Sequence, residues 1–170
     1  MGISYCFCIK WTFFSVDNCI SILGIIINAS VAIWIVKTIQ NRFTNSRILK
    51  DHFIEEIKEI RDEYKLFLNN LYSSKTKAQT AISWFKLMNI KVSNTMEFIN
   101  KSYKINKDIL NPYQNDLREL VTNNDDFNNN YKSTSGIHFS EESRMHLIQF
   151  QQKNYHLFTE IIIRINNYKK

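Results

Sequence analysis

The chain has 170 residues and a formal net charge of +6, and it contains only three glycines and one proline. So few turn-forming residues argue against a β-sandwich or β-barrel, and the length allows one helical domain plus a membrane anchor but not two sizeable cores. The three cysteines, Cys6, Cys8 and Cys19, all precede residue 20, which excludes a disulfide framework or zinc-finger pattern in the remainder.

The first 17 residues are apolar and aromatic, with Lys10 as the single basic residue. Such a composition predicts an N-terminal interfacial segment, residues 1–17, whose rings lie at the depth of the lipid headgroups. A cleaved signal peptide would carry its positive charge before the apolar run. Here most of the charge follows the run, so we expect no cleavage.

Residues 18–36 form the longest uncharged stretch of the chain. As a helix this stretch is about 30 Å long, close to the thickness of the hydrocarbon core of a bilayer, so it predicts one transmembrane helix. A buried core helix is the alternative, but such a helix normally has a polar face. Basic residues are more frequent after this stretch than before it, which predicts a cytoplasmic C-terminal part, residues 37–170, and an N-terminus outside.

Small and polar residues recur on one face of the predicted span. They are spaced three, four and four residues apart: Ser21, Gly24, Asn28 and Ala32. In lipid, small residues at such intervals let helices approach closely, and an amide near mid-depth requires a polar partner. One interpretation is that Asn28 joins helices of several copies; the other is that a ring of Asn28 side chains lines a pore.

A helix is predicted to continue over residues 37–71. From Phe53 onward its apolar residues are spaced alternately four and three, which is typical of a helix packed along its length on other helices. These residues are Phe53, Ile57, Ile60, Tyr64, Phe67 and Leu71, and they are preceded by Ile39 and Phe43.

A second helix is predicted over residues 78–110, after a polar break short enough to make it antiparallel to the first. Its apolar positions are Ile82, Phe85, Met88, Val92, Met96, Ile99 and Tyr103. Trp84 and Phe85 are interpreted as core residues rather than as rings that stack on nucleic-acid bases.

Basic residues are concentrated in and around this second helix. A solvated helix face is one interpretation, and a surface for an anionic partner, either lipid headgroups or nucleic acid, is the other. The candidate anion- or oligonucleotide-binding residues are Lys86, Lys91, Lys101, Lys104 and Lys107.

Two further helices and one loop complete the predicted fold. Asn111 and Pro112 are typical of a helix start, so a helix is predicted over residues 112–122. Residues 123–139 are rich in Asn, Asp, Ser and Gly and predict a loop, either a flexible connector or a segment that orders on a partner. The cap at Ser140 predicts a last helix over residues 140–168, with Ile148, Tyr155, Phe158, Ile162 and Ile165 as its apolar face.

No motif for catalysis is found. The sequence contains no glycine-rich phosphate loop, no nucleophile elbow and no helical pair of histidines with zinc-ligand spacing. His138, Glu142 and His146 are a weak ligand set in a polar region. The expectation is therefore a protein that is not an enzyme and uses no metal and no other cofactor.

The predicted architecture is all-α, with one N-terminal transmembrane helix that continues into a cytoplasmic antiparallel helical bundle. Two functions fit it. One is a homo-oligomeric pore or membrane-disrupting effector of four or more copies, gated by an anion on the cytoplasmic helices. The other is a membrane-anchored scaffold or adaptor that recruits a protein partner through its apolar seams.

A short N-terminal span, a basic helical domain of this size and no enzymatic motif resemble the membrane effectors of bacterial anti-phage systems, among them the ion-channel effector of the Hailong system. The resemblance is one of layout over the whole chain. It implies an oligomeric channel in the bacterial inner membrane. It further implies that single-stranded oligodeoxyadenylate, made by a partner nucleotidyltransferase, holds the channel shut until infection removes it. Lys101, Lys104 and Lys107 would then meet the oligonucleotide.

Overall fold

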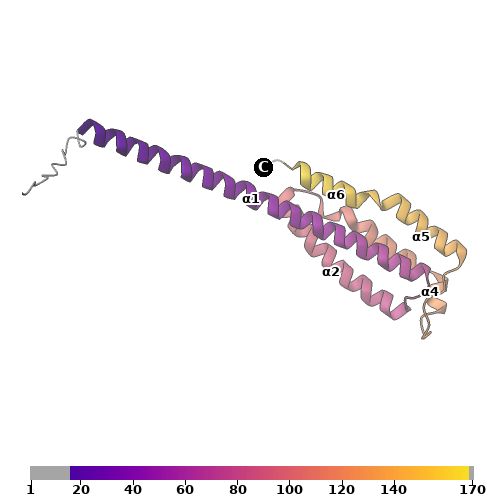
Figure 1. The fold of residues 1–170 in the computed structure, drawn as a ribbon. Coiled ribbons are helices and arrows are strands. Elements are labelled where there is room, and N and C mark those ends of the chain that lie inside the picture. Colours follow the sequence, from indigo (N-terminus) through magenta and orange to yellow (C-terminus); the bar gives the residue numbers. More distant parts are fainter. Residues whose placement is uncertain (1–15, 169–170) are drawn as a thin grey trace, which may run out of the picture. The chain divides into compact units, whose positions relative to one another are not determined.

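The computed structural model describes residues 16–168, with side chains from residue 20 onward. Throughout this range the regular structure is helical and no β-strand is found (Figure 1). The predicted all-α class is therefore confirmed, whereas the interfacial segment predicted over residues 1–17 lies almost wholly outside the described residues. The chain divides into two units, Met1–Arg47 and Ile48–Lys170, which are called the first and second unit below.

Helix α1 (Val16–Tyr72) is 57 residues long and contains both the predicted span and the helix predicted over residues 37–71. Its part in the second unit places the predicted apolar face in the core. The buried residues of this face are Phe53, Ile57, Ile60, Tyr64, Phe67 and Leu71. The two earlier members of the pattern, Ile39 and Phe43, are exposed.

Helix α2 (Ala78–Tyr103) returns alongside the second half of α1 (Figure 1). The Trp84 ring is stacked on the Phe67 ring at 3.8 Å between centroids, near the turn, and the Phe53 and Tyr103 rings meet at 5.8 Å near the other end. Phe85 is buried and Trp84 is partly buried against the core, so their interpretation as core residues is confirmed.

The second helix ends at Tyr103, earlier than the predicted end at residue 110. Lys104 adopts a left-handed conformation with φ 57°, and the Asn100 side-chain amide donates to the carbonyl oxygen of Ile105 at 2.7 Å. This hydrogen bond satisfies a backbone acceptor outside the helix and turns the chain, so that Ile105 is buried. Three short helical segments follow: η1 (Lys107–Leu110, 3₁₀), η2 (Pro112–Asp116, π) and α3 (Leu117–Thr122).

The predicted loop over residues 123–139 contains a short helix, α4 (Asp125–Asn129), and packs on the rest of the second unit. Phe127, Ile137 and Phe139 are buried in the core. The backbone N–H of Ile137 donates to the Thr76 carbonyl at 2.9 Å. At Gly136 a Cβ atom would lie 1.7 Å from the Ser74 carbonyl oxygen, so this close approach requires glycine. The loop is therefore docked on the turn between α1 and α2.

The last predicted helix consists of two, α5 (Glu141–Asn154) and α6 (His156–Asn167). They meet at Tyr155, and just before it the Asn154 side chain donates to the carbonyl of Phe150 at 3.0 Å. The predicted apolar face is wrong at Ile148, which is exposed. The side chains that these two helices contribute to the apolar core are Leu147, Phe158, Ile161 and Ile165.

Aromatic rings from three segments meet at the centre of the second unit. The Tyr64 ring lies 4.9 Å from that of Tyr113, and the Phe158 ring lies 4.7 Å from Tyr113 and 6.2 Å from Tyr64. All three side chains are buried. Burial raises the pKa of the Tyr64 and Tyr113 hydroxyls well above the ordinary value, so both stay neutral. This cluster joins α1, η2 and α6.

A polar contact fastens α4 to the start of α5. The Asp126 carboxylate accepts hydrogen bonds from the Ser140 backbone N–H at 2.9 Å and the Ser143 hydroxyl at 2.7 Å. These bonds, the Ser140 backbone bond first, lower the pKa of the Asp126 carboxyl below its ordinary value of 3.8. Ionised Asp126 therefore stabilises the fold.

We expect Asp126→Ala to lower the free energy of unfolding by about 1 kcal/mol at neutral pH, since two donors lose their acceptor. Because the folded-state pKa of Asp126 is depressed, its contribution is present above 3.8 and is lost as the pH falls through the folded-state pKa. Denaturant unfolding of the two proteins, at neutral pH and at a pH below 3.8, measures both effects. Asp125→Ala, at the exposed neighbouring carboxylate, is the control. An equal loss for the two variants would contradict the assignment.

Candidate functional site

The apolar part of α1 carries no buried side chain between Ile20 and Val36. Ile25 and Ile33 are each 69% exposed and Trp34 is 67% exposed. Among the described residues, one helix is long and apolar enough to cross a membrane, and it contains this segment. Large apolar side chains that surround a helix and are not covered by the described residues are typical of a surface that contacts a membrane or another chain.

The predicted stripe of small and polar residues lies on one side of this helix. At about 100° per residue, Ser21, Gly24, Asn28 and Ala32 fall within one face. A Cβ atom added at Gly24 would have no neighbour within 4 Å. The Asn28 side chain is exposed and makes no hydrogen bond to the part of the chain that the structure describes. At Gly24 and Asn28 the face is therefore open for contact with another helix.

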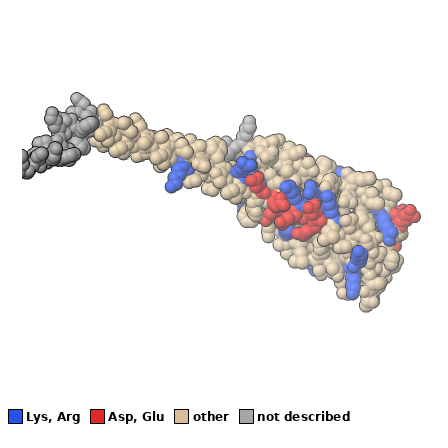
Figure 2. All heavy atoms as spheres, in the orientation of Figure 1, with Lys and Arg blue, Asp and Glu red and all other residues tan. Residues whose placement is uncertain are grey.

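The five candidate lysines do not form one surface. Lys91 donates to Glu63 of α1 at 2.6 Å and lies 3.7 Å from Glu59. This hydrogen bond raises the pKa of the Lys91 ammonium. Figure 2 shows acidic and basic side chains gathered on the visible face of the second unit, while the apolar segment of α1 has no charged atom. Through its contacts with Glu63 and Glu59, Lys91 joins α2 to α1.

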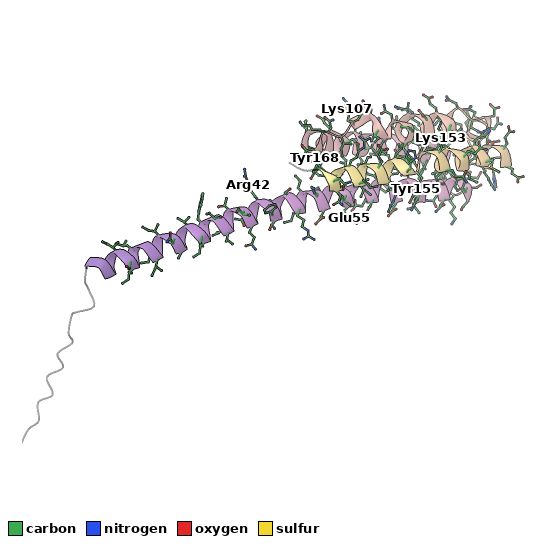
Figure 3. All side chains as sticks on the ribbon, turned by 90° about the horizontal axis from the view of Figure 1, so that it is seen from above. Arg42, Glu55, Lys107, Lys153, Tyr155 and Tyr168 are labelled. Atoms are coloured by element: carbon green, nitrogen blue, oxygen red, sulfur yellow. The ribbon has the colours of Figure 1, made fainter. Side chains whose placement is uncertain are left out.

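Lys101, Lys104 and Lys107 lie near one another at the C-terminal end of α2 and the start of η1. Lys101 pairs with Glu97 at 2.8 Å. Among the described residues, neither Lys104 nor Lys107 makes a salt bridge, and nor does the distant Lys86. The side chains of Lys104 and Lys107 are exposed. Lys107 and Tyr168 lie at the same end of the second unit (Figure 3).

Lys50 has a structural role that the sequence did not indicate. Its ammonium donates to the carbonyl oxygens of Asn166 at 3.0 Å and Tyr168 at 2.8 Å, the C-terminal end of α6. A cation at a helix C-terminus satisfies carbonyls that have no partner in the helix. Because the two positions are far apart in the chain, no local pattern revealed this contact.

The remaining candidates are a groove in the second unit and the predicted weak ligand set around His138. A groove of about 230 Å³ between α1 and α2 is smaller than most ligand pockets; Leu66, Thr80 and Trp84 are among the residues that line it. The His138 ring is hydrogen-bonded to the Ser74 hydroxyl at 3.2 Å. Within residues 16–168 no group of three potential metal ligands is brought together.

No protein-family model matches this chain, and the comparisons with curated proteins and with solved structures found no match.

Proposed function

We propose that this chain is a single-pass membrane protein of the bacterial inner membrane, with its N-terminus outside and its second unit in the cytoplasm. Four or more copies assemble into a gated ion channel or a membrane-disrupting effector of anti-phage defence. The observation that carries the proposal is the uncovered apolar helix: from Ile20 to Val36 no side chain is buried. A bilayer covers such a surface over the required length.

Assembly through the span is supported by the position of Asn28. An amide near the middle of the hydrocarbon layer is costly unless it meets another polar group. The described part of the chain offers none, and small residues on the same face permit a close approach of helices. A second copy supplies an identical amide in an equivalent position. Several such helices around an axis would place Asn28 at the helix contacts or along a lumen.

Gating is assigned to the second unit, which we propose to be an antiparallel helical bundle on the membrane anchor. Lys101, Lys104 and Lys107 are the proposed contacts for a single-stranded oligonucleotide made by a partner nucleotidyltransferase. These three lysines follow or flank the end of α2, where the Tyr103 ring meets the Phe53 ring. Phe53 is close in sequence to Ile48, the first residue of the second unit. Lys91 is not included, because its ion pairs with Glu63 and Glu59 join α2 to α1, whereas the Glu97 partner of Lys101 lies on α2 itself.

A membrane-anchored scaffold or adaptor is the second candidate. It is favoured by the groove between α1 and α2, where Leu66 is 61% exposed beside Thr80 and Trp84. A partner protein could place an apolar side chain there. In this case the span only tethers, and its exchange for an unrelated apolar helix would leave the activity unchanged.

The first test is the mass of the full-length protein in nanodiscs, together with ion flux in liposomes. We expect a defined complex of four or more copies, and we expect Asn28→Leu to change the flux. Ser30→Leu is the matched control, because residue 30 lies on the opposite face of α1. A monomer or dimer has too few helices to enclose a lumen and would favour the scaffold. A full-size complex with equal flux from both variants would leave Asn28 with a packing role only.

A further inference from the structure

Helix α2 has a second apolar face, directed away from the core of its own unit. Leu87 is 68% exposed, Ile90 is 60% exposed and Phe98 is 59% exposed. With Asn94 and Lys101, these residues form one line along the helix, at spacings of three, four, four and three. This set is called the outer stripe. At about 100° per residue it lies opposite the buried residues Phe85, Met88, Val92, Met96 and Ile99.

Three large exposed apolar side chains on one stripe are unusual, although single ones are common on any surface. An apolar partner that covered these side chains would remove their exposed surface from water, which is favourable. Figure 1 shows α2 along the lower edge of the second unit.

We infer that the outer stripe of α2 is the surface through which the second units of neighbouring copies associate, with their α2 helices parallel and in register. The inference rests on the proposed function in one respect: the copies share one membrane and one orientation. Closed assemblies of that kind are cyclic, with the axis perpendicular to the membrane. Equivalent helices around such an axis point the same way, and where the stripe of each copy is turned toward the axis, each of its residues lies level with its own equivalents.

The charges of the stripe suit a contact between identical surfaces. No charged residue lies on it from Leu87 to Phe98. The charge of Lys101 is balanced within its own chain by Glu97 at 2.8 Å. Bringing two stripes together therefore places no unbalanced like charges in contact.

Asn94 supplies the register. Its amide has both a donor and an acceptor, so it is complementary to the same amide of another copy. A single polar residue in an otherwise apolar contact between helices penalises every shifted arrangement, since each shift leaves amides unpaired. The apolar positions of the stripe extend from Leu87 to Phe98, 11 residues further on, which is about three turns of the helix.

The contact is small for an independent interface, and this fits its context. Tethering in one membrane raises the effective concentration of one stripe at the next, so a weak contact suffices. An isolated pair in solution would lack this advantage.

Cysteine cross-linking tests the arrangement, because the chain has cysteines only at positions 6, 8 and 19. In full-length protein with serine at those three positions, Leu87→Cys, Asn94→Cys and Lys101→Cys are made one at a time. The proteins are oxidised in nanodiscs and separated on a non-reducing gel. Disulfides form only where Cα atoms approach to about 4.4–6.8 Å, which parallel helices in register allow at all three positions. Gln149→Cys, at an exposed position of α5, is the control, and helix content by circular dichroism verifies folding.

We expect disulfide-linked dimers from all three variants, formed about tenfold or more faster than from Gln149→Cys. Cross-linking of Asn94→Cys alone would mean an antiparallel crossing and would overturn the inference. No cross-linking above the control, in a complex that still has four or more copies, would also overturn it and leave the proposed function intact. A monomeric mass would overturn both.

Discussion

A protein with arginine in place of both Ile25 and Ile27 is expected to leave the membrane fraction. Each arginine near the centre of a membrane helix costs about 2.5–3.5 kcal/mol for insertion, and each lost isoleucine removes about 0.3–0.6 kcal/mol of favourable transfer. The pair together costs about 6 kcal/mol or more, which corresponds to an equilibrium shift of about four orders of magnitude. The fraction that resists alkaline carbonate extraction measures the effect.

The matched control is arginine in place of both Ile39 and Phe43. These side chains are 48% and 73% exposed and belong to the same helix, but they lie beyond Lys37, the first charge after the apolar stretch. We expect this control to remain in the membrane fraction. Equal behaviour of the two double variants would contradict a crossing at residues 18–36.

Replacement of Phe158 by alanine is expected to lower the free energy of unfolding of the second unit by about 3–5 kcal/mol. Phe158 is 1% exposed, and its ring contacts both Tyr64 and Tyr113. Its removal leaves a cavity where α1, η2 and α6 meet, and the surrounding rings are too rigid to fill it. Thermal or denaturant unfolding, followed by circular dichroism of the full-length protein, measures the loss.

Leu66→Ala is the control for this substitution. Leu66 is 61% exposed on the same unit, so its truncation is expected to change the stability by about 0.5 kcal/mol or less. A comparable loss in both variants would mean that the aromatic cluster does not form the centre of the core.

Local periodicity explains which parts of the fold the sequence predicted. The spacing from Phe53 to Leu71 and the spacing from Phe85 to Tyr103 both predicted helices, and these residues are buried. Such patterns depend on residues within a few turns of one another. They were therefore readable without knowledge of the partner helix.

Contacts between distant residues explain the rest. The docking of residues 123–139 depends on hydrogen bonds such as Ile137 to Thr76, and the end of α2 depends on Asn100 and a left-handed Lys104. A segment rich in Asn and Ser gives no local sign of such partners. The break between α5 and α6 was missed because it falls at Tyr155, whose backbone stays in the right-handed helical region, so no turn-forming residue marks it in the sequence.

The candidate site was predicted only in part for a similar reason. The stripe that contains Asn28 follows from sequence spacing alone. The choice of Lys91 as a candidate anion-binding residue, in contrast, followed from the composition of α2 alone. Its ion pair with Glu63 on another helix could not be predicted from that composition. The outer stripe of α2 was overlooked because its spacing resembles that of the core face on the same helix. Only the exposure of Leu87, Ile90 and Phe98 separates the two.

The contact of Lys50 with the carbonyl of Tyr168 has a consequence for the order of events during synthesis. The two residues are 118 positions apart. At about 5–20 residues per second, a ribosome needs about 6–24 s to make the intervening chain. The apolar stretch over residues 18–36 therefore leaves the ribosome well before α6 exists. Until α6 emerges, Tyr64 and Tyr113 lack their contact with Phe158, so the nascent second unit exposes aromatic surface of the kind that chaperones bind.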